Sequence, residues 1–86
     1  MTTYNGYTNY ETWKVNLEMI DGLTPKDLCV LDPSDSYLVA GALKEYCEER
    51  LESEGRGLAL SFALAFLDDV DWKQIAELLI EAYADA

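Results

Sequence analysis

A long amphipathic segment between Pro33 and Ser53 restricts this chain to folds that are built on helices. Its apolar side chains recur every three or four residues, the spacing of one face of an α-helix. Asp32 precedes it as a capping residue, and proline is well tolerated at the first helical position. The segment predicts a helix over 33–53 whose buried face comprises Val39, Ala42, Leu43, Tyr46, Cys47 and Leu51.

A shorter helix is predicted near the start of the chain. Asn9 is a good N-cap, and Glu11 follows in the first turn, near the positive end of the helix dipole. Asp21-Gly22 ends this helix, and the later Thr24-Pro25 pair opens only a turn. The stripe predicted to be buried comprises Tyr10, Trp13, Leu17 and Ile20.

Two more helices are predicted in the second half. The segment 58–67 is apolar almost all round and lacks β-branched residues, which favours a buried central helix. A last helix begins near Asp71, which forms a capping box with Gln74. Its inward side chains are predicted to be Trp72, Ile75, Ala76, Leu79 and Tyr83, and its outward ones Gln74, Glu77, Glu81 and Asp85.

These segments predict an all-α fold, a compact single-domain bundle of about four helices over residues 1–86. A chain of 86 residues is too short for two independent cores. Half of its residues are hydrophobic, which argues for a packed core and against intrinsic disorder.

The net charge of −11, from 17 acids and 6 bases, limits the classes of partner. Such a chain repels nucleic acid and anionic lipid, so its natural complement is a basic protein surface. The sequence contains no histidine, which excludes Ser-His-Asp triads, Cys-His dyads and His-liganded metals. We therefore expect no enzyme activity, no catalytic residue, no cofactor and no metal site.

The two cysteines, Cys29 and Cys47, leave two states open. One disulfide would join them in an oxidising compartment, but two buried thiols in a reducing cytoplasm are the favoured interpretation. The start of the chain has neither the basic nor the apolar region of a secretory signal. The longest apolar run would span only half a bilayer as a helix. We expect a cytoplasmic protein without a membrane span.

A row of glutamates is the most suggestive feature for function. The four side chains follow the i, i+3, i+4, i+7 spacing of one helix face, over about 10 Å. They could imitate a phosphate backbone before a basic groove, or they could be an ordinary solvated helix face, and both interpretations stay open. Like charges at this spacing cost stability, and no lysine is interleaved to offset them. The row comprises Glu45, Glu48, Glu49 and Glu52.

Other candidate contact residues lie outside this row. Glu77 and Glu81 either extend the acidic surface or are solvated, and Asp68 and Asp69 either contact a partner or cap helices. The aromatic residues near the start are either interface anchors or side chains that wrap the bundle. For Trp13 the structural role is favoured; for Tyr4 and Tyr7 both roles stay open.

Two blocks of this sequence resemble a known family. The block from Tyr4 to Val15 resembles the YNGYxNYETWNV signature of small proteins of unknown function from bacteriophages and other mobile elements. The block from Val70 to Ile75 resembles the VDWxEI start of the last helix in those proteins. The two blocks cover about a fifth of the chain. The sequence departs from the family in two ways: Lys14 replaces the usual Asn, and the middle of the chain is shorter and more apolar than expected for the family. The resemblance implies a mobile-element origin, and by analogy a role against host defence.

The net charge, the glutamate row and the family resemblance together suggest an anti-CRISPR-type inhibitor in the cytoplasm of a bacterial or archaeal host. It would bind a basic surface of a host nucleic-acid-binding protein or CRISPR effector complex, and not nucleic acid itself. One alternative is a structural module that self-associates as a homo-oligomer through the apolar segment 58–67. Another is the capture of a host DNA-binding regulator.

Overall fold

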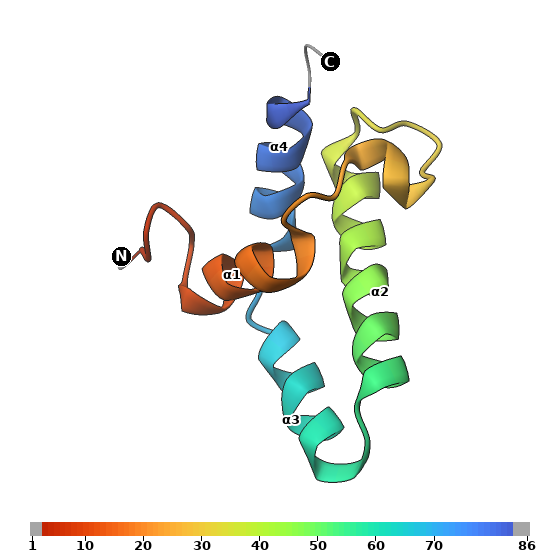
Figure 1. Ribbon diagram of the computed structural model, residues 1–86. Helices are drawn as coiled ribbons and strands as arrows, with labels where there is room; N and C mark the ends of the chain where they lie inside the picture. The colour runs from red at the N-terminus through yellow and green to blue at the C-terminus, as the bar shows by residue number, and fades with distance from the viewer. Residues whose placement is uncertain (1–2, 84–86) are drawn as a thin grey trace.

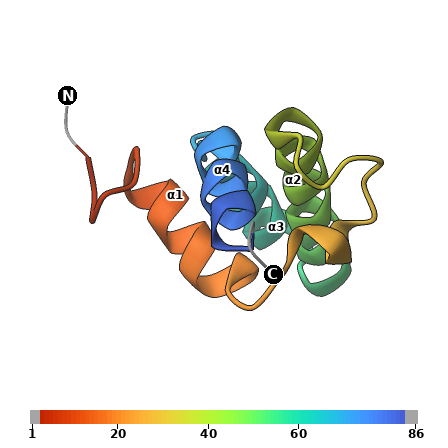
Figure 2. The ribbon, with the colours of Figure 1, turned by 90° about the horizontal axis from the view of Figure 1, so that it is seen from above.

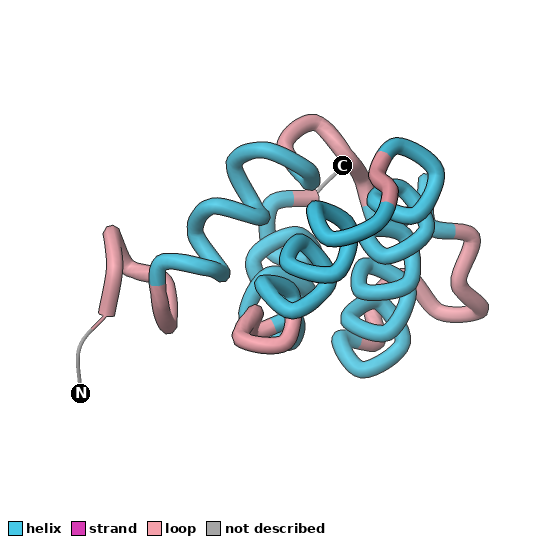
Figure 3. The backbone as a smooth tube through the Cα atoms, turned by 90° about the horizontal axis from the view of Figure 1, so that it is seen from below, coloured by secondary structure: helices cyan, strands magenta, loops and turns pink. Residues whose placement is uncertain are grey.

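The computed structural model describes residues 3–83 and confirms the all-α fold. Its helices are α1 (Tyr10–Val15), which continues into the π-helical turn η1 (Asn16–Ile20), the 3-10 turn η2 (Pro25–Leu28), α2 (Ser36–Glu54), α3 (Gly57–Leu67) and α4 (Trp72–Ala82). Loops join these helices, and residues 3–83 form no strand (Figure 3). Asp85, which was predicted to face outward, lies outside the described residues.

The long helix α2 organises the bundle. The shorter helices α3 and α4 follow each other along its length, and α1 crosses near the junction between them (Figure 1). Seen from above, α1 and α4 lie on the same side of α2 (Figure 2). The buried core lies between these elements and comprises Val15, Ile20, Val39, Leu43, Cys47, Leu67, Val70, Ile75 and Ala76. The predicted buried face of α2 is confirmed at its centre, by Val39, Leu43 and Cys47.

A hydrogen-bonded clasp joins α1 to the start of α4, and both family-like sequence blocks contribute to it. The side chain of Asn9 accepts from the backbone N–H of Thr12 at 2.9 Å and donates to the carbonyl of Asp69 at 2.6 Å. The Thr12 hydroxyl, fully buried, accepts from the backbone N–H of Asp71 at 2.8 Å. The predicted N-cap role of Asn9 is confirmed, and the same side chain also fixes the turn before α4.

The clasp also changes the predicted capping box of α4. Asp71 is the N-cap, since its carboxylate accepts from the backbone N–H of Gln74 at 3.1 Å. The Gln74 side chain, which was predicted to face outward, is half-buried and accepts from the backbone N–H of Thr8 at 2.8 Å. The Asp71 N–H is already bonded to Thr12, so the reciprocal half of the box does not form. Thr12, which is distant in sequence, thus replaces Gln74 as the acceptor of the Asp71 N–H.

The predicted buried stripe of the first helix is wrong for half of its members. Ile20 is buried and Trp13 half-buried, but Tyr10 and Leu17 are exposed. In η1 the N–H of Asp21 bonds the carbonyl five residues earlier, at 3.0 Å, which adds one residue to the turn. The buried face of this segment lies about a third of a turn from the predicted stripe, and its members Thr12, Val15 and Ile20 still follow a helical spacing. Thr12 and Val15 are buried instead.

The start of the long helix also differs from the prediction. Asp32 does not cap it, because its carboxylate accepts from both the backbone N–H and the hydroxyl of Ser34 and so closes a separate turn. Asp35 caps α2 by accepting from the backbone N–H of Tyr37 at 2.9 Å. The helix therefore begins at Ser36 instead of Pro33. The proline pair that comes first in the chain, Thr24-Pro25, opens only a short turn, as predicted.

The prediction of a buried central helix over 58–67 is correct for the helix and wrong for its burial. Of the residues in α3, only Leu67 is fully buried, whereas Leu58 and Phe62 are 71% and 68% exposed. The helix lies at one end of the bundle, where α2 covers one of its sides (Figure 1). The radius of gyration, 13.0 Å, accordingly exceeds the roughly 12 Å expected for a chain of this length.

Candidate functional site

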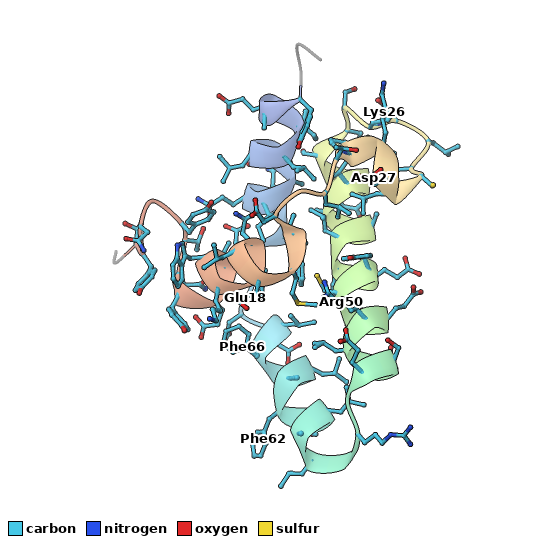
Figure 4. All side chains as sticks on the ribbon, in the orientation of Figure 1. Glu18, Lys26, Asp27, Arg50, Phe62 and Phe66 are labelled. Atoms are coloured by element: carbon cyan, nitrogen blue, oxygen red, sulfur yellow. The ribbon has the colours of Figure 1, made fainter. Side chains whose placement is uncertain are left out.

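The glutamate row lies on the side of α2 that faces away from the core. Because Val39, Leu43 and Cys47 face inward, residues about half a turn away must face solvent. Glu45, Glu49 and Glu52 are exposed, while Glu48 is half-buried. Figure 4 shows oxygen-tipped side chains projecting from the side of α2 opposite α3 and α4. We call Glu45, Glu49 and Glu52 the acidic face of α2.

Within the described residues 3–83, no cation of the protein neutralises this face. Among residues 3–83, the only ion pairs are Lys14–Glu18 at 3.3 Å and Arg50–Glu54 at 3.0 Å. Lys44 is exposed on α2 but forms no ion pair with the row. Arg50 lies on the side of α2 that faces η1 and α3, where it binds Glu54 (Figure 4). The face therefore keeps its full negative charge available to a partner.

A small hollow adjoins the acidic face and adds a carboxylate that the sequence did not reveal. It has a volume of about 220 Å³ and is lined by Asp27, Leu28, Ala42, Glu45, Tyr46 and Glu49. Asp27 comes from η2, and one of its oxygens accepts from the backbone N–H of Thr24 at 2.9 Å. Its other oxygen has no hydrogen-bond partner among the described residues. We call this feature the acidic hollow.

The acidic hollow has the composition of a receptor for a basic side chain. Three carboxylates from two elements line it, and charge-assisted bonds to Lys or Arg are the strong ones. Leu28 and Ala42 offer apolar surface to the methylene stem of such a side chain, and Tyr46 offers a ring edge or face. No group of three or more potential ligands within residues 3–83 is arranged to hold a metal ion.

The other predicted acidic residues lie on different parts of the surface. Glu77 and Glu81 are exposed on α4, opposite the side on which Ile75 and Ala76 pack against α2. They therefore point away from the acidic face of α2. Asp68 and Asp69 are exposed in the turn before α4, where the Asp69 carbonyl is part of the clasp. The structure does not bring the eight predicted acids together in one surface.

The aromatic residues near the start form a cluster against α1. Tyr4 and Tyr7 pair their backbones at 2.8 Å around an Asn5-Gly6 turn. The ring of Tyr4 lies 5.2 Å from that of Tyr10 and 5.0 Å from that of Trp13. The half-buried Tyr7 accepts a hydrogen bond from the side chain of Asn16, at 2.9 Å. Tyr7 thus has a structural role, whereas the ring of Tyr4 stays 40% exposed.

Both cysteines are free thiols, and they differ in exposure. Cys47 is buried in the core as expected, and burial raises the pKa of its thiol to about 12. Cys29 is exposed, which corrects the expectation of two buried thiols.

We therefore predict that iodoacetamide at pH 8 modifies Cys29 at least roughly 100-fold faster than Cys47, since only exposed thiols with accessible thiolate react readily. Peptide mass spectrometry over time measures both rates. A Cys29→Ser variant should show almost no labelling until denaturant is added. Equal rates in the folded wild-type protein would contradict the burial of Cys47.

Comparison of this chain with protein-family models, with curated proteins and with solved structures finds no match. None of the helices described for residues 3–83 is long and apolar enough to cross a bilayer.

Proposed function

We propose that this protein inhibits a host defence system of the CRISPR type by binding a basic, nucleic-acid-handling surface through the acidic face of α2. The observation that carries the proposal is that Glu45, Glu49 and Glu52 are exposed and have no ion-pair partner among the described residues. Uncompensated like charges on one helix face destabilise the free protein and are relieved when a cationic surface covers them.

The proposed mechanism is electrostatic and steric. The row from Glu45 to Glu52 spans about 10 Å, comparable with a few successive phosphates of one DNA strand. The acidic hollow receives one Lys or Arg side chain of the partner, between Asp27, Glu45 and Glu49. Long-range attraction between the −11 chain and a basic groove accelerates encounter. The bound protein then occupies the space that target nucleic acid needs.

The experiment measures inhibition directly. Purified CRISPR effector complexes of several types are incubated with the protein, and binding of labelled target DNA is followed by fluorescence anisotropy. We expect inhibition of at least one complex that competing target DNA relieves, and binding that weakens roughly tenfold between 0.1 and 0.5 M salt. If no complex is inhibited, or if inhibition is independent of salt, the proposal is wrong. Basic DNA-binding domains of host regulators, tested in parallel, separate the alternative partner class.

A further inference from the structure

The outer side of α3 is a largely apolar surface. Leu58 and Phe62 are largely exposed, and Ala59 and Ala65 are exposed beside them. The single polar side chain of the helix, Ser61, is also exposed and borders this surface three residues after Leu58. Figure 4 shows Phe62 and Phe66 on the side of α3 away from α2.

This surface continues into the aromatic cluster and into an apolar groove. The Tyr10 ring packs edge-on against Phe66, with centroids 6.4 Å apart, and Tyr4 packs on Tyr10. Beside Phe62 and Phe66 runs a groove of about 390 Å³ between α3, α1 and the end of α2. Its apolar lining comprises Val15, Met19, Leu51, Phe62, Ala63, Phe66 and Leu67. A continuous exposed apolar surface of this kind marks an interaction site.

The charges around α3 distinguish this surface from the rest of the molecule. No residue of α3 is charged, although the whole chain has a net charge of −11. The acids that line the adjoining grooves, Glu18 and Glu54, are paired with Lys14 and Arg50. Arg56, immediately before the helix, adds a cation that forms no ion pair among residues 3–83. Three of the six cations of the sequence therefore surround α3. The acids Glu18, Glu54, Asp68 and Asp69 nearly cancel them, so this surface is locally close to neutral.

We propose that the outer side of α3 binds a second copy of this chain. The bulky residues of that side, Leu58, Phe62 and Phe66, follow one another at four-residue intervals, with Phe62 central in the helix. A two-fold axis through Phe62 pairs two antiparallel α3 helices, packing Leu58 of each copy against Phe66 of the other. Such a self-complementary pattern is what an isologous dimer requires. Two strongly acidic copies repel least where their surfaces are neutral.

The size of the apolar surface on α3 determines how tightly two copies are expected to bind. The 11 residues of α3 span about 16 Å, so this face and its aromatic extension fall short of the roughly 800 Å² per partner of a standard interface. We expect a reversible dimer with a dissociation constant on the order of 0.1 mM. The dimer leaves the acidic face of α2 free, because that face lies on another side of the molecule. The inference is therefore independent of the proposed function.

Sedimentation equilibrium over a range of protein concentrations tests the proposal. The wild-type protein should shift from monomer to dimer as its concentration rises, and more so at 0.5 M than at 0.1 M salt, because salt screens the repulsion between copies. Binding to a basic partner should instead weaken as the salt concentration rises, so either proposal can be refuted without the other. A wild-type protein that stays monomeric to about 1 mM at both salt concentrations would overturn the dimer.

A pair of matched double variants locates the interface. Leu58→Gln with Phe62→Gln should weaken dimerisation at least tenfold while the helical circular dichroism stays unchanged, since both side chains are exposed in the monomer. The control replaces the equally exposed Leu31 and Tyr37 by Gln and should change dimerisation less than twofold. If the first variant dimerises like the wild type, or if the control weakens the dimer as much, α3 is not the interface.

Discussion

Replacing Glu45, Glu49 and Glu52 together by Gln is expected to weaken binding to the basic partner about 100-fold, from roughly 1 kcal/mol for each lost charge contact. Gln keeps the length and helix propensity of Glu, so the variant removes charge and little else. The three side chains are exposed and make no hydrogen bond or ion pair among the described residues. We therefore expect the variant to fold at least as stably as the wild type.

The matched control removes the same charge from another side of the molecule. Glu77→Gln, Glu81→Gln and Asp68→Asn change three exposed carboxylates that likewise form no ion pair. Because net charge alone affects encounter rates, this control should weaken binding only a few-fold. Anisotropy titrations against the inhibited complex, at one fixed salt concentration, compare the three proteins. Equal losses for the two variants would mean that overall charge, and not the acidic face of α2, determines binding.

The clasp residue Thr12 gives the largest expected change in stability. Thr12→Val keeps the shape of the side chain but leaves the N–H of Asp71 without its acceptor and Asn9 without its hydroxyl donor. We expect a loss of about 2–3 kcal/mol in the free energy of unfolding, because the Asp71 N–H loses its acceptor beside the fully buried Thr12 side chain. For a domain of this size that corresponds to a melting temperature lower by roughly 10–20 °C.

A conservative variant separates the hydrogen bonds from packing at the same position. Thr12→Ser keeps the hydroxyl and removes only the methyl group, so it should cost about 1 kcal/mol or less. Urea unfolding followed by circular dichroism measures all three proteins. If the Val variant is as stable as the Ser variant, the hydroxyl bonds of the clasp contribute nothing to stability.

Much of the fold could be predicted from the sequence, because caps and apolar spacing are local signals. Asn9 and Asp71 were recognised as N-caps, and Val39, Leu43 and Cys47 as core residues. The predictions of the fold that were wrong concern features that depend on tertiary contacts. The buried face of the first helix includes the polar Thr12, whose hydroxyl binds the turn before α4, so a pattern of apolar residues alone misplaces Tyr10 and Leu17. An apolar segment such as 58–67 carries no signal that says whether neighbours cover it.

The candidate site likewise combines features that local sequence signals predict with features that depend on tertiary contacts. Exposure of Glu45, Glu49 and Glu52 follows directly from the helical period of α2. Asp27 could not be linked to them, because 18 residues separate it from Glu45 and a turn of irregular path lies between. Its hydrogen bond from the Thr24 N–H is local, whereas its position beside Glu45 and Glu49 depends on tertiary structure. The acidic hollow exists because η2 folds back against α2, which no periodic pattern encodes.

The clasp has a consequence for how the protein is made. Thr8, Asn9 and Thr12 bind groups about 60 residues further along the chain, whereas α2 and α3 are adjacent in sequence. On the ribosome, the first helix is therefore synthesised long before its partners emerge. A six-residue helix is too short to persist alone in water. The segment around α1 must wait, without stable structure, for α4 to be synthesised before it can take its final shape.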